Sequence, residues 1–166
     1  GADIALITTN NPDCNDPETV TLGEKVPFVI DGPGSYEVRG LFFNGAMSKT
    51  KDGKMNTVYG FELDGIKIAF LGLATTDTPL VGEAKEIATS ADMVFVPVLD
   101  DPASAYKSAV GYDPNVIIPY EYDSASLARF LKEGGQEKAG AEDKLTLKRR
   151  DLDGKEGHIV VLTAQD

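Results

Sequence analysis

The sequence predicts an α/β layered domain in which a mixed β-sheet is covered by helices on one face. Most strand signals are short, apolar and β-branched, and they are bounded by Gly, Pro, Asn or Asp. Helical patterns occur only in the second half of the chain. From residue 66 onward the expected order is strand, helix, strand, helix, strand, helix and then two strands. We therefore expect residues 1–166 to form a single domain.

Nine strands are expected from the apolar runs, at residues 3–8, 26–30, 35–43, 57–63, 66–72, 93–98, 115–119, 144–149 and 158–163. Asp64 and Gly65 separate two of these runs. They predict a two-residue hairpin, because both turn positions need positive φ. Asp153 and Gly154 predict a second turn, which would join the last two strands.

Helices are expected near residues 80–90, 102–111 and 124–133. The third has the clearest boundaries, since Asp123 or Ser124 caps its start and Gly134 with Gly135 ends it. Its apolar side chains recur at i, i+3 and i+4, so one face is expected to pack on the sheet.

The charge and the residue counts exclude several classes of function. Sixteen basic residues stand against 27 acidic ones, for a net charge of −11, and no basic tract is present. Nucleic acid and anionic membrane are therefore not expected as partners. No run of about 18 apolar residues and no signal peptide is seen, so we expect a cytoplasmic protein. One histidine, His158, and one cysteine, Cys14, cannot build a disulfide scaffold or a His-rich zinc site.

The segment at residues 8–16, TTNNPDCND, follows the first strand and is the first candidate for a functional loop. Its side chains offer oxygen and sulfur ligands. The same residue types also form turns with no further role, and composition alone favours that second interpretation.

Five segments resemble, in order, the metallo-β-lactamase fold, in particular the small metal-dependent hydrolases similar to ascorbate-6-phosphate lactonases. Residues 2–15 resemble the first metal motif, His-x-His-x-Asp-His. Four further segments of this chain resemble segments of that family. FVIDGPGSYEV at 28–38 resembles the family's "IDGPGEYEV", and NTVY at 56–59 resembles its "NTIY". FLG at 70–72 resembles its "HLGD", and VIIPYEY at 116–122 resembles its "IVIPMHY". The resemblance implies an αββα sandwich and a metal-dependent hydrolase.

The resemblance also shows which residues occupy the ligand positions of that family. Histidine positions are occupied by Thr9, Asn11, Cys14, Thr50 and Glu121, and Asp13 alone matches. Leu73 stands at the position of the bridging aspartate, where an apolar side chain cannot coordinate a metal. The resemblance therefore implies a fold whose dinuclear centre has been lost.

Two main functional hypotheses follow. The first is a degenerate family member without a cofactor, acting as a binding or structural protein. The alternative is a hydrolase of an ester, lactone or phosphoester, with zinc or another divalent metal held by Asp13, Cys14 and Glu121 and with Asp77 within loop reach. A metal-free hydrolase built on Cys14 or a serine lacks a paired base, because His158 is remote in the sequence.

Strands that precede the first motif in the family have no counterpart in this sequence. We therefore expect a domain that lacks its N-terminal strands, with an open sheet edge or an uncovered core face. Such a surface favours a homo-oligomer, or association with a separate N-terminal segment.

Overall fold

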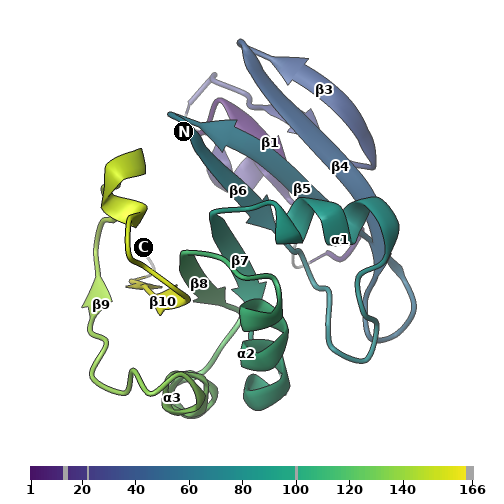
Figure 1. Cartoon of the computed structure of the whole chain (residues 1–166). Coiled ribbons are helices and arrows are strands. Elements are labelled where there is room, and N and C mark those ends of the chain that lie inside the picture. Colours follow the sequence, from purple (N-terminus) through teal and green to yellow (C-terminus); the bar gives the residue numbers. More distant parts are fainter. Residues whose placement is uncertain (13–14, 22, 100, 164–166) are drawn as a thin grey trace.

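The computed structural model describes residues 1–12, 15–21, 23–99 and 101–163. Asp13 and Cys14, two of the expected ligand positions, lie outside this part of the chain. The described residues form a central sheet with helices on one face and two small sheets on the other (Figure 1). The predicted α/β class, with a mixed sheet covered by helices on one face, is confirmed.

Seven strands make the central sheet, in the order β10-β8-β7-β6-β5-β4-β3. They are β3 (Gly34–Val38), β4 (Leu41–Lys49), β5 (Met55–Leu63), β6 (Ile66–Phe70), β7 (Met93–Pro97), β8 (Val116–Tyr120) and β10 (His158–Ile159). Strands β3 to β6 are antiparallel to their neighbours, whereas β6, β7, β8 and β10 run parallel. The carboxyl ends of β6, β7 and β8 therefore meet at one edge of the sheet.

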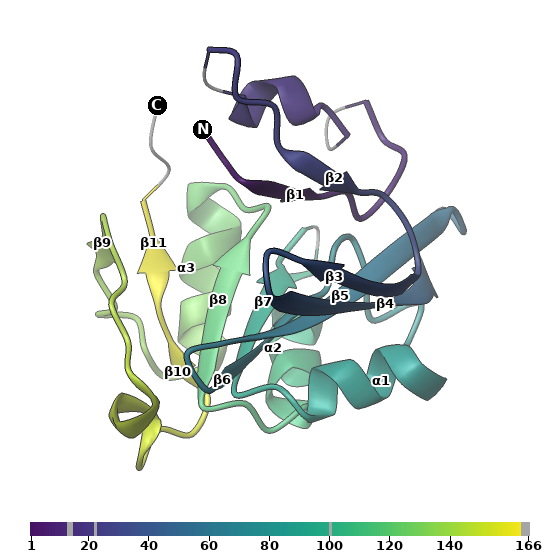
Figure 2. The same ribbon diagram turned by 90° about the horizontal axis from the view of Figure 1, so that it is seen from above.

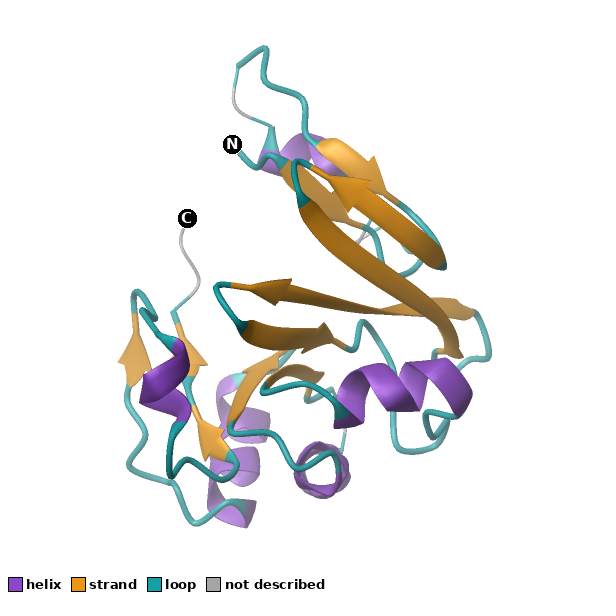
Figure 3. Cartoon of the chain, turned by 45° about the horizontal axis from the view of Figure 1, so that its top comes forward, coloured by secondary structure: helices purple, strands orange, loops and turns teal. Residues whose placement is uncertain are grey.

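Three helices cover one face of the sheet: α1 (Gly82–Thr89), α2 (Pro102–Gly111) and α3 (Ser124–Glu133). Figure 3 shows them on the same side of the strands. Asp101 caps α2 and Asp123 caps α3, each by accepting a hydrogen bond from a backbone N–H group of the first turn. All three predicted helices are present. No helix within the described ranges has the length and apolar composition needed to cross a bilayer.

The opposite face carries two small parallel sheets. Strand β1 (Ile4–Leu6) pairs with β2 (Phe28–Ile30), and β9 (Ala141–Glu142) pairs with β11 (Val161–Leu162). Figure 2 shows β1 and β2 over one part of the central sheet and β9 and β11 beside another part. Two short 3-10 helices, η1 (Pro17–Val20) and η2 (Arg149–Leu152), complete the fold.

Two of the predicted strands are wrong. Residues 35–43 form parts of β3 and β4 rather than one strand, because Arg39 and Gly40 take left-handed conformations with φ of 54° and 78° and reverse the chain. Residues 144–149 form no strand. Their apolar side chains Leu145 and Leu147 pack on the sheet face instead.

The predicted turn at Asp153 and Gly154 does not join two paired strands. The turn follows η2. After it, β10 pairs in parallel with β8, and β11 pairs in parallel with β9. The Arg149 guanidinium pairs with Asp92, at the start of β7, and so fixes η2 near the sheet. By contrast, the Asp64-Gly65 hairpin is confirmed, with φ of 51° and 77°.

A buried tyrosine joins β1 and β2 to the central sheet. The side chain of Tyr59 on β5 is fully buried, and its hydroxyl lies 2.9 Å from the carbonyl oxygen of Ile7 and 3.3 Å from that of Ile30. Burial of the phenol raises the pKa of Tyr59 to about 12.

We expect this tyrosine to make folding stability depend on pH in alkaline solution. The raised pKa means that the folded state favours the neutral phenol, so its contribution is complete below pH ~10 and is lost as the pH rises from ~10 to ~12. Urea denaturation across this range should show a steeper loss of stability in the natural protein than in Tyr59→Phe. Equal slopes for the two proteins would contradict the assignment.

Candidate functional site

The candidate site lies at the carboxyl edge of β6, β7 and β8, where α/β sheets place their functional loops. Each of these strands is followed by a residue in the left-handed region: Gly72 (φ 62°), Leu99 (φ 47°) and Glu121 (φ 52°). Leu99 and Glu121 carry side chains, so each conformation costs about 1 kcal/mol. Strain of this kind is concentrated at functional sites, and here it occurs on two adjacent strands.

Thr9 lies in this region because the chain after β1 runs beside the start of β5. The backbone N–H of Thr57 donates to the carbonyl oxygen of Thr8 at 2.7 Å. The hydroxyl of Thr9 is buried and donates to the carbonyl oxygen of Met55 at 3.0 Å. The hydroxyl proton of Thr9 is therefore already used within the fold.

Asn56 organises the turn that contains Leu73. Its fully buried side chain donates to the hydroxyl of Ser48 (2.7 Å) and to the carbonyl oxygen of Leu71 (3.0 Å), and it accepts from the backbone N–H of Leu73 (2.8 Å). Every polar atom of the amide group thus has a partner. The turn at residues 71–73 is held in one conformation, with the Leu73 side chain half-buried.

A further contact ties the ends of β8 and β6 together. The hydroxyl of Tyr120 donates to the carbonyl oxygen of Gly72. The same ring stacks on Phe70, with the ring centroids 4.9 Å apart. Glu121 follows Tyr120 directly, so the positions of Thr9, Leu73 and Glu121 are brought to one edge of the sheet.

Thr50 lies at the tip of the β4-β5 hairpin. Its buried hydroxyl donates to the Asp52 carboxylate at 2.5 Å and accepts from the backbone N–H of Lys54 at 3.1 Å. This is a local turn network. The hydroxyl of Thr78 ties the hairpin to the loop after β6 by donating to the carbonyl oxygen of Lys49 at 2.9 Å.

The side chains of Glu121, Asn11 and Asp77 have different surroundings. The side chain of Glu121 is exposed and lines a polar hollow that also contains Arg129. Asn11 is half-buried in the loop after β1 and has an interaction partner of its own. Asp77 lines a different pocket from Glu121.

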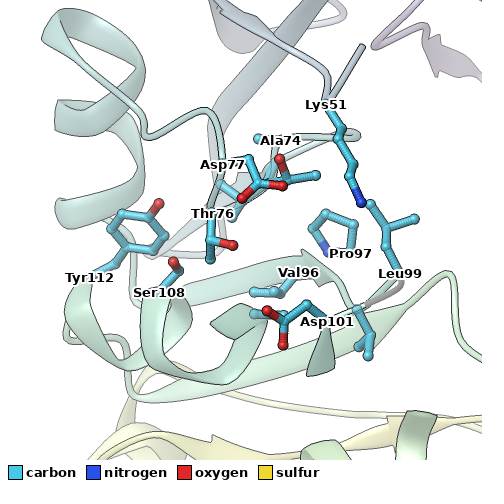
Figure 4. A pocket seen from close by; sticks show the side chains of 14 residues that line it. Lys51, Ala74, Thr76, Asp77, Val96, Pro97, Leu99, Asp101, Ser108 and Tyr112 are labelled. Atoms are coloured by element: carbon cyan, nitrogen blue, oxygen red, sulfur yellow. The ribbon is translucent and has the colours of Figure 1, made fainter. Parts of the chain in front are cut away.

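That second pocket has a volume of about 60 Å³ and opens between the loop after β6 and helix α2. Its floor is apolar and consists of Leu71, Val96 and Val98. Figure 4 shows Thr76, Ser108 and Tyr112 gathered on one side and Lys51 with Leu99 on the other. The carboxylates of Asp77 and Asp101 complete the polar lining.

Two groups of this pocket have shifted pKa values. Hydrogen bonds from Ser104 hold the pKa of the Asp101 carboxyl below its usual range, so this group stays ionised at neutral pH. Burial raises the pKa of the Tyr112 phenol, which stays neutral. The pocket therefore combines a fixed negative charge with neutral hydroxyl groups.

The described residues do not fit a dinuclear zinc centre. Zinc sites use Cys, His, Asp or Glu donors. Across residues 1–12, 15–21, 23–99 and 101–163, no group of three such side chains lies close enough to hold a metal ion. Leu73 supplies an apolar side chain at the position where the resemblance expects a bridging carboxylate, and Thr9 supplies a hydroxyl that donates to a backbone carbonyl oxygen.

Asn56, Gly72 and Tyr120 were not singled out from the sequence as parts of the site. Asn56 and Gly72 fall inside the NTVY and FLG segments, so the resemblance did contain a signal for them. The role of Tyr120 depends on a contact 48 residues away along the chain, and no local pattern indicates it.

Comparisons with known proteins agree with this fold. A structure of a proposed Zn-dependent hydrolase of the metallo-beta-lactamase superfamily from Thermotoga maritima is 24% identical, with a TM-score of 0.65 over 97% of this chain and 81% of that chain. A proposed metal-dependent hydrolase from Parabacteroides distasonis is 15% identical, with a TM-score of 0.63 over 99% and 77% of the two chains. The comparison with curated proteins gave no match.

These two likenesses show the fold, since both identities are below 25%. The sequence also matches a family directly. The model of the Beta-lactamase superfamily domain matches residues 1–121, which is more than half of the chain. The protein therefore belongs to the beta-lactamase superfamily.

Proposed function

We propose that this chain is a binding protein built on the metallo-β-lactamase fold, without the dinuclear metal centre of that fold. Its segments resemble in particular the branch of small metal-dependent hydrolases similar to ascorbate-6-phosphate lactonases. In this proposal the carboxyl edge of the sheet binds a small ligand and does not hydrolyse it. Thr9, Asn11, Asp13, Cys14, Thr50, Leu73 and Glu121 are then remnants of the ligand positions.

The observation that carries the proposal is the turn around Leu73. Asn56 binds both sides of this turn through the carbonyl oxygen of Leu71 and the N–H of Leu73. Its amide group is fully buried, and both of its N–H groups and its oxygen are hydrogen-bonded within the fold. The turn is thus built as a structural element, and its apolar side chain excludes the shared carboxylate that two metal ions need.

The metal content tests this proposal. We expect protein prepared without chelator to contain less than about 0.1 zinc, manganese or iron per chain, because the described edge supplies too few donors. Elemental analysis by mass spectrometry gives the number directly.

The alternative hydrolase makes the opposite prediction. Stoichiometric metal that disappears in Asp13→Ala, but persists in the control Asp143→Ala, would contradict the proposal and support a site of Asp13, Cys14 and Glu121. Cytoplasmic location and self-association stay predictions from the sequence.

A further inference from the structure

The pocket beside α2 has walls that are fixed by the fold. On one side, the hydroxyl of Thr78 donates to the carbonyl oxygen of Lys49. The backbone N–H of Thr78 donates to the carbonyl oxygen of Thr75 at 3.2 Å, which closes the loop into a turn. On the other side, Asp101 caps α2. The pocket therefore exists before any ligand binds, which lowers the entropy cost of binding.

The polar groups at this pocket are mostly acceptors. Asp77 comes from the loop, Asp101 from the start of α2, and Thr76 and Ser108 add hydroxyl groups on one side of the pocket (Figure 4). Carboxylates accept hydrogen bonds only, and hydroxyl groups can turn to accept. A ligand that fits such a lining brings donors.

The charge of the pocket agrees with a cationic ligand. The described lining residues carry two carboxylates, Asp77 and Asp101, against the ammonium group of Lys51, which leaves a formal charge of −1. Lys51 has an interaction partner of its own. One monovalent cation balances this lining, and the net charge of −11 on the chain adds a favourable long-range field.

The floor and the volume limit the size of that cation. Leu71, Val96 and Val98 offer an apolar surface, which favours a short hydrocarbon chain over a bare inorganic ion. A volume of about 60 Å³ equals the space of roughly four water molecules. This accommodates an ammonium group and two or three carbon atoms.

We propose that the pocket between the loop after β6 and helix α2 binds the primary ammonium group of a small aliphatic amine. The ammonium group lies at Asp77 and the hydroxyl groups of Thr76 and Ser108, and the carbon chain lies on the apolar floor. This inference rests on the proposed binding function and names its ligand class. It requires no metal.

The test is a titration of the isotopically labelled protein with propylammonium, followed by amide chemical shifts at constant ionic strength. Propan-1-ol and propionate serve as ligands of the same length without the positive charge. Because so few atoms bind, an affinity of about 1 mM is expected. We expect saturable shifts at residues 74–78 and 101–108 with propylammonium alone.

Two variants place the ligand within the pocket. Asp77→Asn should weaken propylammonium binding at least ~10-fold, since a charge-assisted hydrogen bond is lost. The control Asp64→Asn should change the affinity for propylammonium less than ~2-fold, because Asp64 lies at the opposite end of β6, on the other edge of the sheet. Ser108→Leu should abolish binding by filling the pocket.

Several results would overturn the proposal: no saturable shift up to about 50 mM, equal binding of propan-1-ol or propionate, or unchanged affinity in Asp77→Asn or Ser108→Leu. Metal content is measured on the same sample. Stoichiometric metal together with propylammonium binding would refute the proposed loss of the metal centre and leave the amine site intact. A metal-free sample that does not bind propylammonium would refute the amine site alone.

Discussion

Replacing Asn56 with alanine is expected to lower the free energy of unfolding by about 3 kcal/mol. The substitution removes three hydrogen bonds of a fully buried amide group and leaves the N–H of Leu73 without its acceptor, whereas the carbonyl oxygen of Leu71 keeps a hydrogen bond from the N–H of Ala74. A buried group that loses its partner costs about 1 to 3 kcal/mol, and the other lost hydrogen bonds add to this. Urea denaturation followed by circular dichroism measures the change.

Asn44→Ala is the matched control for this experiment. Asn44 lies on the neighbouring strand β4, is exposed, and accepts one hydrogen bond, from the hydroxyl of Ser35. Its removal should cost less than about 1 kcal/mol. If the two variants were equally stable, the Asn56 network would have no special weight, and the argument that the turn around Leu73 is a structural element would fail.

Gly72→Ala is expected to lower the free energy of unfolding by about 3 kcal/mol as well. Gly72 has φ of 62°, which already costs a residue with a side chain about 1 kcal/mol. An alanine Cβ at this position would also stand 2.3 Å from Oδ1 of Asn56 and 2.8 Å from Cβ of Thr8. Neither neighbour can move without breaking a buried hydrogen bond or shifting the backbone.

Gly135→Ala separates strain from overlap, because Gly135 has the same φ of 62° and no atom within 4 Å of an added Cβ. We expect this control to lose only about 1 kcal/mol. In the Asn56→Ala background, Gly72→Ala should cost about 1 kcal/mol less than in the natural protein, because one of the two close contacts is gone. Strict additivity of the two substitutions would rule out the predicted contact.

The position of Leu73 shows how far the site could be predicted. The FLG segment and its resemblance indicated that Leu73 occupies the place of a ligand, and the structure places it at the carboxyl edge near Thr9. The sequence did not indicate which contacts hold the turn around Leu73. That depends on Asn56 meeting the turn from 15 and 17 residues away along the chain.

The pocket beside α2 was harder to predict for the same reason. Its lining comes from the β4-β5 hairpin (Lys51), the loop after β6 (Asp77) and the helix α2 (Asp101, Ser108). None of these segments has a motif for ligand binding. Their side chains form a site only because parallel strands bring the intervening loops to one edge.

The elements that the sequence predicted correctly are those with signals within a few residues. The cap Asp123 and the turn pair Asp64-Gly65 act through contacts of at most three positions, so they are visible in any local window. The strand predicted at residues 144–149 failed because its apolar alternation satisfies packing on a sheet face as well as it satisfies strand pairing. Pattern alone does not distinguish these two outcomes.

Composition and the order of strands and helices follow from the chain alone, because they are properties of residue identity and short-range spacing. Which hydrogen bonds form at the carboxyl edge of the sheet, and which acceptors surround the pocket, depend on segments that meet only after folding. Contacts such as Tyr120 with Gly72 and Asn56 with Leu73 join residues 48 and 17 positions apart, and their geometry is set by the register of the sheet.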